Sequence, residues 1–398
     1  MGRFFRNDLH DEFGSWLLGY TATGGPDIGV LEAVGTAVGD GDDAAFNAAW
    51  MAMGERFVAE ADTLLAAERA ASARRLLFWA SACFATSYHP LYGAPVDPRL
   101  VASFRRQIEV FDRALALLPH PVKPLRIPFE GTTMPGYLLP AEGHEATVRP
   151  LVILTNGYDA TVTENYFAVA AAVAARGFHC LFFDGPGQGE MLILQGLPIR
   201  PDWEAVIRPV VDFALGLPGV DPGRIALAGW SLGGYLALRG ASGEPRLAAC
   251  IADPGLRAVL TPESLSRFGA GVAGTATPGS LAEAGLEELL KANPGMRWKL
   301  VQRGFWVHGV KSLGEYAEAA MAMTLEGRVG MIRCPTLLTT AENDPLSHGA
   351  EALLAELACP KALLRFTAAE GAGDHCEMGN RSLATLRTLD WLEGILAP

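Results

Sequence analysis

Two hydrophobic patterns divide the chain near residue 123. Before that point apolar residues recur every three or four positions, which is the spacing along one face of a helix. The clearest stripe consists of Leu100, Phe104, Ile108, Phe111, Leu115 and Leu118, and a second one of Phe46, Trp50, Met53 and Phe57. A third helical run, 76–88, stops at His89-Pro90. We therefore predict an N-terminal helical domain over residues 1–122.

After residue 123 the apolar residues gather in short runs typical of buried strands. These runs are 125–129, 134–139, 151–154, 178–183, 225–228, 249–252, 336–339 and 363–366, and helical patterns over 164–176, 202–217, 346–357 and 381–396 separate most of them. Such alternation predicts an α/β fold with a mostly parallel sheet covered by helices on both faces. The first two strands, joined by Gly131-Thr132-Thr133, are expected to form an antiparallel hairpin at the edge. We assign residues 123–398 to this second domain.

Residues 255–330 interrupt the alternation with helical and glycine-rich sequence, including Gly269–Gly274. An insertion at this point lies over the carboxyl ends of the strands, where open α/β sheets bind their ligands. We therefore expect a cap over the site.

Composition narrows the possible partners. Half of the 398 residues are hydrophobic, which is enough for a large core, and the net charge of −12 disfavours nucleic acid and anionic membranes as partners.

The first eight residues contain no apolar signal segment, and no apolar run reaches 18 residues, so we expect a cytoplasmic protein. The six cysteines are scattered without a Cys-x-x-Cys pair, which predicts free buried thiols and no metal site.

The segment Gly229-Trp230-Ser231-Leu232-Gly233 carries the strongest chemical signal. It follows the strand run 224–228 and precedes residues 234–238, which can open a helix, so Ser231 matches a nucleophile elbow. A serine hydroxyl needs a general base, and that base needs a carboxylate to fix its tautomer. In this fold both follow the serine, the acid first.

Asp344 and His375 fit this order. Asp344 lies in the loop after the run 336–339, and His375 is the only histidine that follows the last strand. Glu342 and Asp253 are alternative acids, because each also follows a strand.

The oxyanion formed by serine attack needs two N–H donors. Leu232, directly after the nucleophile, offers one, and Tyr158 in the loop after the third strand is the candidate for the other, since Gly157 lets that loop turn its amides inward. Asp159 could brace this loop. Glu164 closes the sequence Thr161-Val162-Thr163-Glu164, which we interpret as a helix capping box rather than a catalytic acid.

Other polar or aromatic clusters are less specific. Residues 184–190, Asp-Gly-Pro-Gly-Gln-Gly-Glu, lack the spacing of a phosphate-binding loop, so we interpret them as a structural turn beside the site and expect no cofactor. Five residues, Tyr88, His89, Tyr92, Trp306 and His308, could line a substrate pocket between the helical block and the cap, although ordinary packing is the simpler interpretation.

Seven motifs together resemble one known group. They are Met134–Leu138, Asn156–Asp159, Asp184–Gly189, Gly229–Gly234, His308–Val310, Glu342–Asp344 and Glu370–Cys376. The chain is similar to the α/β-hydrolases with an N-terminal helical region, the group of 2,6-dihydroxypseudooxynicotine hydrolase and the fungal polyketide-shortening hydrolases of pigment pathways. This resemblance implies that Ser231, Asp344 and His375 are the triad. It also implies cleavage of a carbon-carbon bond next to a carbonyl, or of an ester, and a homodimer formed through the helical region.

The main hypothesis is therefore a cofactor-independent serine hydrolase that acts on a small carbonyl compound, an ester or a β-diketone or polyketide-like aryl ketone. An acyltransferase or cyclase could use the same triad if water is kept from the acyl-enzyme. A binding module that retains only the fold is the non-enzymatic alternative, against which the ordered triad argues.

Overall fold

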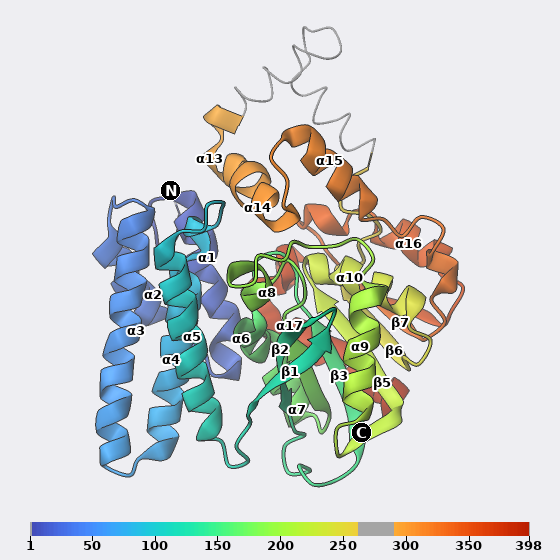
Figure 1. Cartoon of the computed structure of the whole chain (residues 1–398), viewed down its shortest axis with the longest axis horizontal. Coiled ribbons are helices and arrows are strands. Elements are labelled where there is room, and N and C mark those ends of the chain that lie inside the picture. Colours follow the sequence, from blue (N-terminus) through green and yellow to red (C-terminus); the bar gives the residue numbers. More distant parts are fainter. Residues whose placement is uncertain (1, 262–289, 398) are drawn as a thin grey trace, which may run out of the picture.

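The computed structural model describes residues 2–261 and 290–397, which form an eight-stranded sheet flanked by helices (Figure 1). The glycine-rich run Gly269–Gly274 lies outside the described residues. The strands are β1 (Pro124–Phe129), β2 (Thr132–Leu139), β3 (Arg149–Thr155), β4 (His179–Phe183), β5 (Val220–Trp230), β6 (Ala249–Asp253), β7 (Thr336–Ala341) and β8 (Lys361–Phe366).

The strand order is β1-β2-β4-β3-β5-β6-β7-β8. β2 runs antiparallel to both of its neighbours, β1 and β4, and every other pair is parallel. The predicted strands, the mostly parallel sheet and the edge hairpin are therefore confirmed.

Helices cover both faces of the sheet, as consecutive residues of β5 show. Leu227 contacts Gly240 of α10 (Leu232–Gly243), which also packs against α9 (Glu204–Leu215). Ala228 instead faces a small cavity that it shares with α7 (Ala171–Ala175) and α17 (Arg381–Leu396). Because neighbouring side chains of a strand point to opposite faces, α9 and α10 lie on one face, and α7 and α17 on the other.

The chain before the sheet is helical, as predicted, and lies beside the sheet in Figure 1. Its elements are α1 (Asp8–Ser15), the 3₁₀ segments η1 (Trp16–Thr23) and η2 (His89–Leu91), α2 (Ile28–Val38), α3 (Asp43–Ala66), α4 (Ala70–Ser87) and α5 (Pro98–Ala116). Phe111 on the apolar stripe of α5 packs against Tyr137 of β2, with ring centroids 5.3 Å apart. The stripe thus faces the sheet domain. Among the described helices none combines the length and hydrophobicity needed to span a bilayer.

The helix after β3 has an irregular centre. It begins with α6 (Val162–Asn165), passes through the π-helical turn η3 (Tyr166–Ala170) and continues as α7. The predicted capping box is confirmed, because the side chains of Thr161 and Glu164 each accept a hydrogen bond from the other residue's backbone N–H.

The predicted helix 346–357 begins later than expected, and only α16 (Ala350–Glu356) is α-helical. Residues Pro345–Ser347 form the 3₁₀ turn η6 instead. The Ser347 hydroxyl lies 2.9 Å from the backbone carbonyl oxygens of both Ala341 and Asp344 and shares its one hydrogen between them, which holds the chain in this turn.

The segment between β6 and β7 supplies the cap. Its described helical elements include α13 (Pro294–Arg297), the π-helix η4 (Trp298–Gly304), α14 (Phe305–His308), α15 (Leu313–Ala322) and the 3₁₀ turn η5 (Val329–Met331). Figure 1 shows α13 to α15 in orange above the sheet. Short elements complete the fold: α8 (Gly189–Ile193), η7 (Ala368–Glu370) and η8 (His375–Asn380).

Candidate active site

Ser231 lies on a sharp turn between β5 and α10. Its backbone angles are φ 59° and ψ −131°, in a region that non-glycine residues rarely adopt. A Cβ atom on Gly229 would lie 2.0 Å from the carbonyl oxygen of Gly233, and one on Gly233 would lie 2.6 Å from that of Thr155. The two glycines are therefore required by close backbone packing, which explains the motif.

A hydrogen-bonded chain connects Ser231, His375 and Asp344. Nε2 of His375 lies 3.0 Å from Oγ of Ser231, and Nδ1 lies 2.8 Å from Oδ2 of Asp344. Asp344 is buried, and its other oxygen accepts a hydrogen bond from the backbone N–H of Leu346. The structure thus brings together three residues predicted from chain order.

The alternative acids lie elsewhere. Glu342 accepts a hydrogen bond from the backbone N–H of Ala368, and Asp253 is paired with Arg381.

The surroundings of His375 favour its protonated form. Burial lowers its pKa, but the neighbouring Cys376 and Asp344 raise it, and the net pKa lies well above the ordinary value for histidine. Asp344 therefore does two things for the imidazole: it fixes the ring through Nδ1, and it stabilises the cation that forms when Nε2 takes a proton.

A buried charge cluster supports the turn that carries His375. Arg381 donates to Oδ2 of Asp253 and, at 3.0 Å, to the carbonyl oxygen of Cys376, and it lies 3.4 Å from Glu377. Cys376 and Glu377 both have positive φ, 56° and 51°. Because two successive non-glycine residues in this conformation are strained, the turn depends on the contacts that hold it.

The loop after β3 lies directly against the elbow. A Cβ atom on Gly157 would lie 2.8 Å from Cβ of Ser231 and 3.0 Å from the backbone nitrogen of Leu232. Within the described chain, no backbone oxygen accepts a hydrogen bond from the N–H of Tyr158 or of Leu232. Both predicted oxyanion donors are therefore free of backbone partners.

Asp159 ties this loop to two other parts of the chain. Its carbonyl oxygen accepts a hydrogen bond of 2.7 Å from the hydroxyl of Tyr92 and lies 3.3 Å from Nε2 of His89. Its carboxylate forms an ion pair of 2.7 Å with Arg303 of η4. The helical block and the cap thus meet at one residue of the loop.

The tyrosine ring beside it is held by the cap. The Arg303 guanidinium lies 4.5 Å from the centroid of Tyr158, whose hydroxyl shares a hydrogen bond with Nε2 of His308. Burial and the nearby Arg303 lower the pKa of His308 to about 4, so its imidazole is neutral near pH 7.

The remaining predicted pocket residues divide into two groups. Trp306 packs edge-on against Tyr92, with centroids 5.0 Å apart, between the cap and the helical block. Tyr88 stacks on His89 and donates to Gln107 of α5, so it belongs to the core of the helical block.

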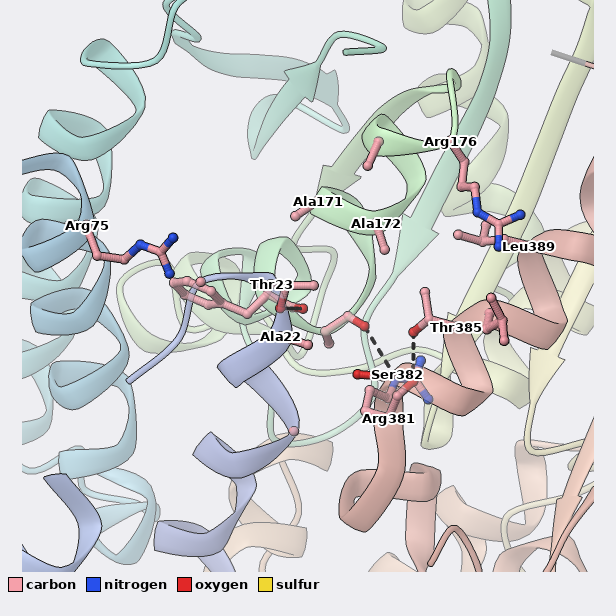
Figure 2. Close-up of a pocket in the computed structure, with 16 residues that line it drawn as sticks. Ala22, Thr23, Arg75, Ala171, Ala172, Arg176, Arg381, Ser382, Thr385 and Leu389 are labelled. Atoms are coloured by element: carbon pink, nitrogen blue, oxygen red, sulfur yellow. Dashed lines mark hydrogen bonds between the residues drawn. The ribbon is translucent and has the colours of Figure 1, made fainter. Parts of the chain in front are cut away.

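A cavity of about 540 Å³ opens elsewhere, between η1, α7 and α17 (Figure 2). Its lining includes Arg75, Arg176 and Arg381, and none of Ser231, Asp344 and His375. The described residues contain no cluster of three or more His, Cys, Asp or Glu side chains that could hold a metal ion, and all six cysteines are free.

Sequence reasoning missed three residues around the site: Gln188, Arg303 and Arg381. Gln188 is the one hydrogen-bonding side chain between the glycines of residues 185–189, which was a usable signal. Arg303 pairs with the partly buried Asp159 and Arg381 with the buried Asp253, 144 and 128 residues away, and spacing alone cannot pair residues at such distances.

Comparison with known proteins shows the family of the chain. The sequence model of the alpha/beta hydrolase family matches residues 152–384. The chain is similar to hydrolase LUC6 of Fusarium sp, with 33% identity over 82% of this chain and 80% of the relative. It is also similar to 20-hydroxy-prefusarin hydrolase FUS2 of Gibberella moniliformis, with 30% identity over 100% of this chain and 99% of the relative.

A solved structure shares the fold of the chain. The crystal structure of 2,6-dihydroxy-pseudo-oxynicotine hydrolase superposes with a TM-score of 0.76 and 25% sequence identity, over 95% of both chains. The N-terminal helices and the cap are thus part of the likeness as well as the sheet.

Proposed function

The chain belongs to the alpha/beta hydrolase family and is an enzyme of the hydrolase class, and from this premise we propose that Ser231 is its nucleophile, His375 its general base and Asp344 the acid that orients the base. One observation carries the proposal: the three side chains form a hydrogen-bonded chain that ends at a serine on a strained turn.

Each step of the reaction then has a residue. His375 accepts the hydroxyl proton at Nε2 while Oγ of Ser231 attacks the carbonyl carbon, and the N–H groups of Tyr158 and Leu232 hold the developing oxyanion. The tetrahedral intermediate collapses to an acyl-enzyme, and His375 delivers its proton to the leaving group. Water, deprotonated by the same imidazole, then releases the acid and regenerates Ser231.

We propose an ester, or a carbon-carbon bond next to a carbonyl, as the bond that is cleaved. In the second case the leaving group departs as a carbanion or enolate, which requires a ketone or phenol ring to stabilise it and a proton from His375. A β-diketone or polyketide-like aryl ketone meets both conditions. The similarity to FUS2 and to 2,6-dihydroxy-pseudo-oxynicotine hydrolase supports this choice.

Labelling with a fluorophosphonate probe tests the nucleophile without knowledge of the substrate. We expect mass spectrometry to find the probe on Ser231 of the parent and no labelling of Ser231→Ala, which should also lose activity by several orders of magnitude. An unlabelled Ser231 in folded protein would overturn the proposal.

The fate of the acyl group separates hydrolysis from acyl transfer. The cap packs against the helical block through Trp306 and Tyr92 and pairs with the loop after β3 through Arg303 and Asp159, and a cap over the site favours exclusion of water. Hydrolysis in heavy-oxygen water places the label in the released acid. An unlabelled cyclic or transferred product would instead identify a cyclase or acyltransferase.

We also propose that residues 1–122 form a separate domain that makes a homodimer contact, and that the enzyme is cytoplasmic. The family resemblance supports the dimer, and six free cysteines are typical of a reducing compartment. Sedimentation of the intact chain and of variants on the outer faces of α2 and α3 tests the dimer.

A further inference from the structure

Gln188 lies beneath the loop that holds the second oxyanion donor. It follows β4 in the run Asp184–Glu190, and its side chain is buried. Nε2 donates to the carbonyl oxygen of Asn156 at 2.7 Å and to that of Gly157 at 3.2 Å. Oε1 accepts from the backbone N–H of Gly185 at 2.9 Å. Because a backbone N–H can only donate, this last bond fixes which end of the amide faces the loop.

These contacts set the direction of two N–H groups. In a trans peptide the C=O and the following N–H point in opposite directions. With the carbonyls of Asn156 and Gly157 both held by Gln188, the N–H groups of Gly157 and Tyr158 point away from it. Successive N–H groups aimed to one side form a concave binding site for an anion.

Ser231 lies close to the same loop. The nearest neighbours of a Cβ atom on Gly157 would be Cβ and Oγ of Ser231 and the backbone nitrogen of Leu232. The donors at Tyr158 and Leu232 therefore come from two chain segments that meet at the nucleophile.

Asp184 secures the first residue of the loop from the same turn. Its Oδ1 accepts a hydrogen bond of 2.9 Å from Nδ2 of Asn156, and the carboxyl group is fully buried. A Cβ atom on Gly189 would lie 1.8 Å from Oδ2 of Asp184, so the glycine is needed for this close packing. Asn156 is thus held by its side chain as well as by its carbonyl.

We propose that Gln188 is a positioning residue of the oxyanion hole: by holding the carbonyls of Asn156 and Gly157 it aims the N–H of Tyr158 at the oxyanion. The inference rests on the proposed function of Ser231. Because the negative charge develops only in the transition state, loss of Gln188 lowers kcat and leaves KM nearly unchanged.

Gln188→Met tests this with little change in volume, since it keeps the length of the side chain and removes its donor. The matched control is Gln195→Met. Gln195 also donates a side-chain hydrogen bond to a backbone carbonyl, that of Thr133 at 3.2 Å, but this carbonyl belongs to β2 rather than to the oxyanion loop. A purely structural role predicts similar behaviour of the two variants.

The readouts are the second-order rate of fluorophosphonate labelling and the kcat and KM for p-nitrophenyl butyrate. We expect Gln188→Met to lower the labelling rate and kcat about 100-fold, which is the cost of one lost oxyanion donor. Gln195→Met should react at the parent rate. If Gln188→Met does not fold, as judged by its melting temperature, Gln188→Glu serves instead, because a carboxylate would repel both carbonyls.

The outcomes separate the two proposals. If the parent is labelled at Ser231 and a folded Gln188 variant is labelled as fast, or differs only in KM, the inference about Gln188 is wrong and the nucleophile stands. If the folded parent is not labelled at all, the proposed function itself fails.

Discussion

Nδ1 of His375 lies 2.8 Å from Oδ2 of Asp344, at the end of the imidazole that faces away from Ser231. The pair joins the loop after β7 to the turn after β8. Both loops leave the carboxyl edge of the sheet, where β5 also ends, directly before Ser231. The parallel sheet is therefore what brings residues 113 and 144 positions from the serine into one site.

Asp344→Asn should lower kcat about 10³- to 10⁴-fold, since the amide favours the wrong tautomer of the imidazole. It should also move the pH profile. In the parent the raised pKa of His375 makes kcat/KM fall as the pH drops through that value, because the base must be neutral. Without the Asp344 carboxylate the pKa of His375 should be lower, so the fall of kcat/KM on the acid side of the profile should move to lower pH.

Glu342→Gln is the control for this prediction. Glu342 lies two residues before Asp344 and accepts a hydrogen bond from the backbone N–H of Ala368. The kcat/KM of this variant should therefore fall at the same acidic pH as that of the parent. Profiles of kcat/KM between pH 5 and 10 measure the shift, and an unchanged acid limb in Asp344→Asn would contradict the coupling.

The sheet and the hydrogen-bonded arrangement of Ser231, His375 and Asp344 were predictable from sequence for a physical reason. Strands buried on both faces consist of continuous apolar runs, as in Leu151–Leu154 of β3, and these runs stand out between helical patterns. The positions of Ser231, Asp344 and His375 follow from chain order once the strands are placed, because each residue lies in the segment that follows a strand.

The partners of the residues that support the site were not predictable, because they lie on loops that meet only in the folded chain. Gln188 reaches carbonyls 31 and 32 residues away, and nothing in the local pattern states that two turns after adjacent strands touch. Arg303 lies in a π-helix of the cap. Because a π-helical turn is wider than an α-helical one, the spacing of apolar residues along an α-helix does not predict which face Arg303 occupies.

Asp184 should make the protein less stable as the pH rises. Burial raises the pKa of its carboxyl group to about 8, whereas an unfolded aspartate titrates near 3.9. Below about pH 4 both states are protonated. Between about pH 4 and 8 the unfolded chain loses this proton and the folded chain keeps it, so the free energy of unfolding falls by up to about 1.4 kcal/mol per pH unit.

Asp184→Asn removes this titration and should flatten the dependence. Denaturant titrations at pH 5, 6, 7 and 8 give the slopes. Asp202→Asn is the control: its pKa is lowered by the hydrogen bond to Arg200, so it stays ionised across this range and should not alter the slope. Equal slopes in the parent and Asp184→Asn would count against a buried, protonated Asp184.

Arg381→Met should destabilise the fold strongly, because it leaves the buried carboxylate of Asp253 without its cation. Breaking a buried ion pair costs about 3–5 kcal/mol. Arg176→Met is the matched control, since Arg176 and Arg381 line one cavity (Figure 2). Because Arg176 pairs with the exposed Asp390, its replacement should cost at most about 1 kcal/mol. Similar free energies of unfolding for the two variants would show that the cluster does not support the fold.

The contact between the cap and the loop after β3 leads to a prediction about catalysis. Arg303 pairs with Asp159 and lies over the Tyr158 ring, so Arg303→Met should loosen the residue that we propose as an oxyanion donor. A displacement near 1 Å can cost about 100-fold, and we expect the labelling rate of Ser231 to fall about 10- to 100-fold. Lys299→Met is the control, because Lys299 lies in the same π-helix but pairs with the partly exposed Glu12.

A double variant separates two effects of Arg303→Met, the loss of the Arg303–Asp159 contact between cap and loop and the burial of an unpaired carboxylate. Arg303→Met alone leaves the Asp159 carboxylate without its cation, which by itself destabilises the loop. Asp159→Asn combined with Arg303→Met removes that charge, so it should recover much of the lost stability while labelling of Ser231 stays slow. If the double variant regains the parent labelling rate, the unpaired charge alone explains the single variant, and the cap does not position Tyr158.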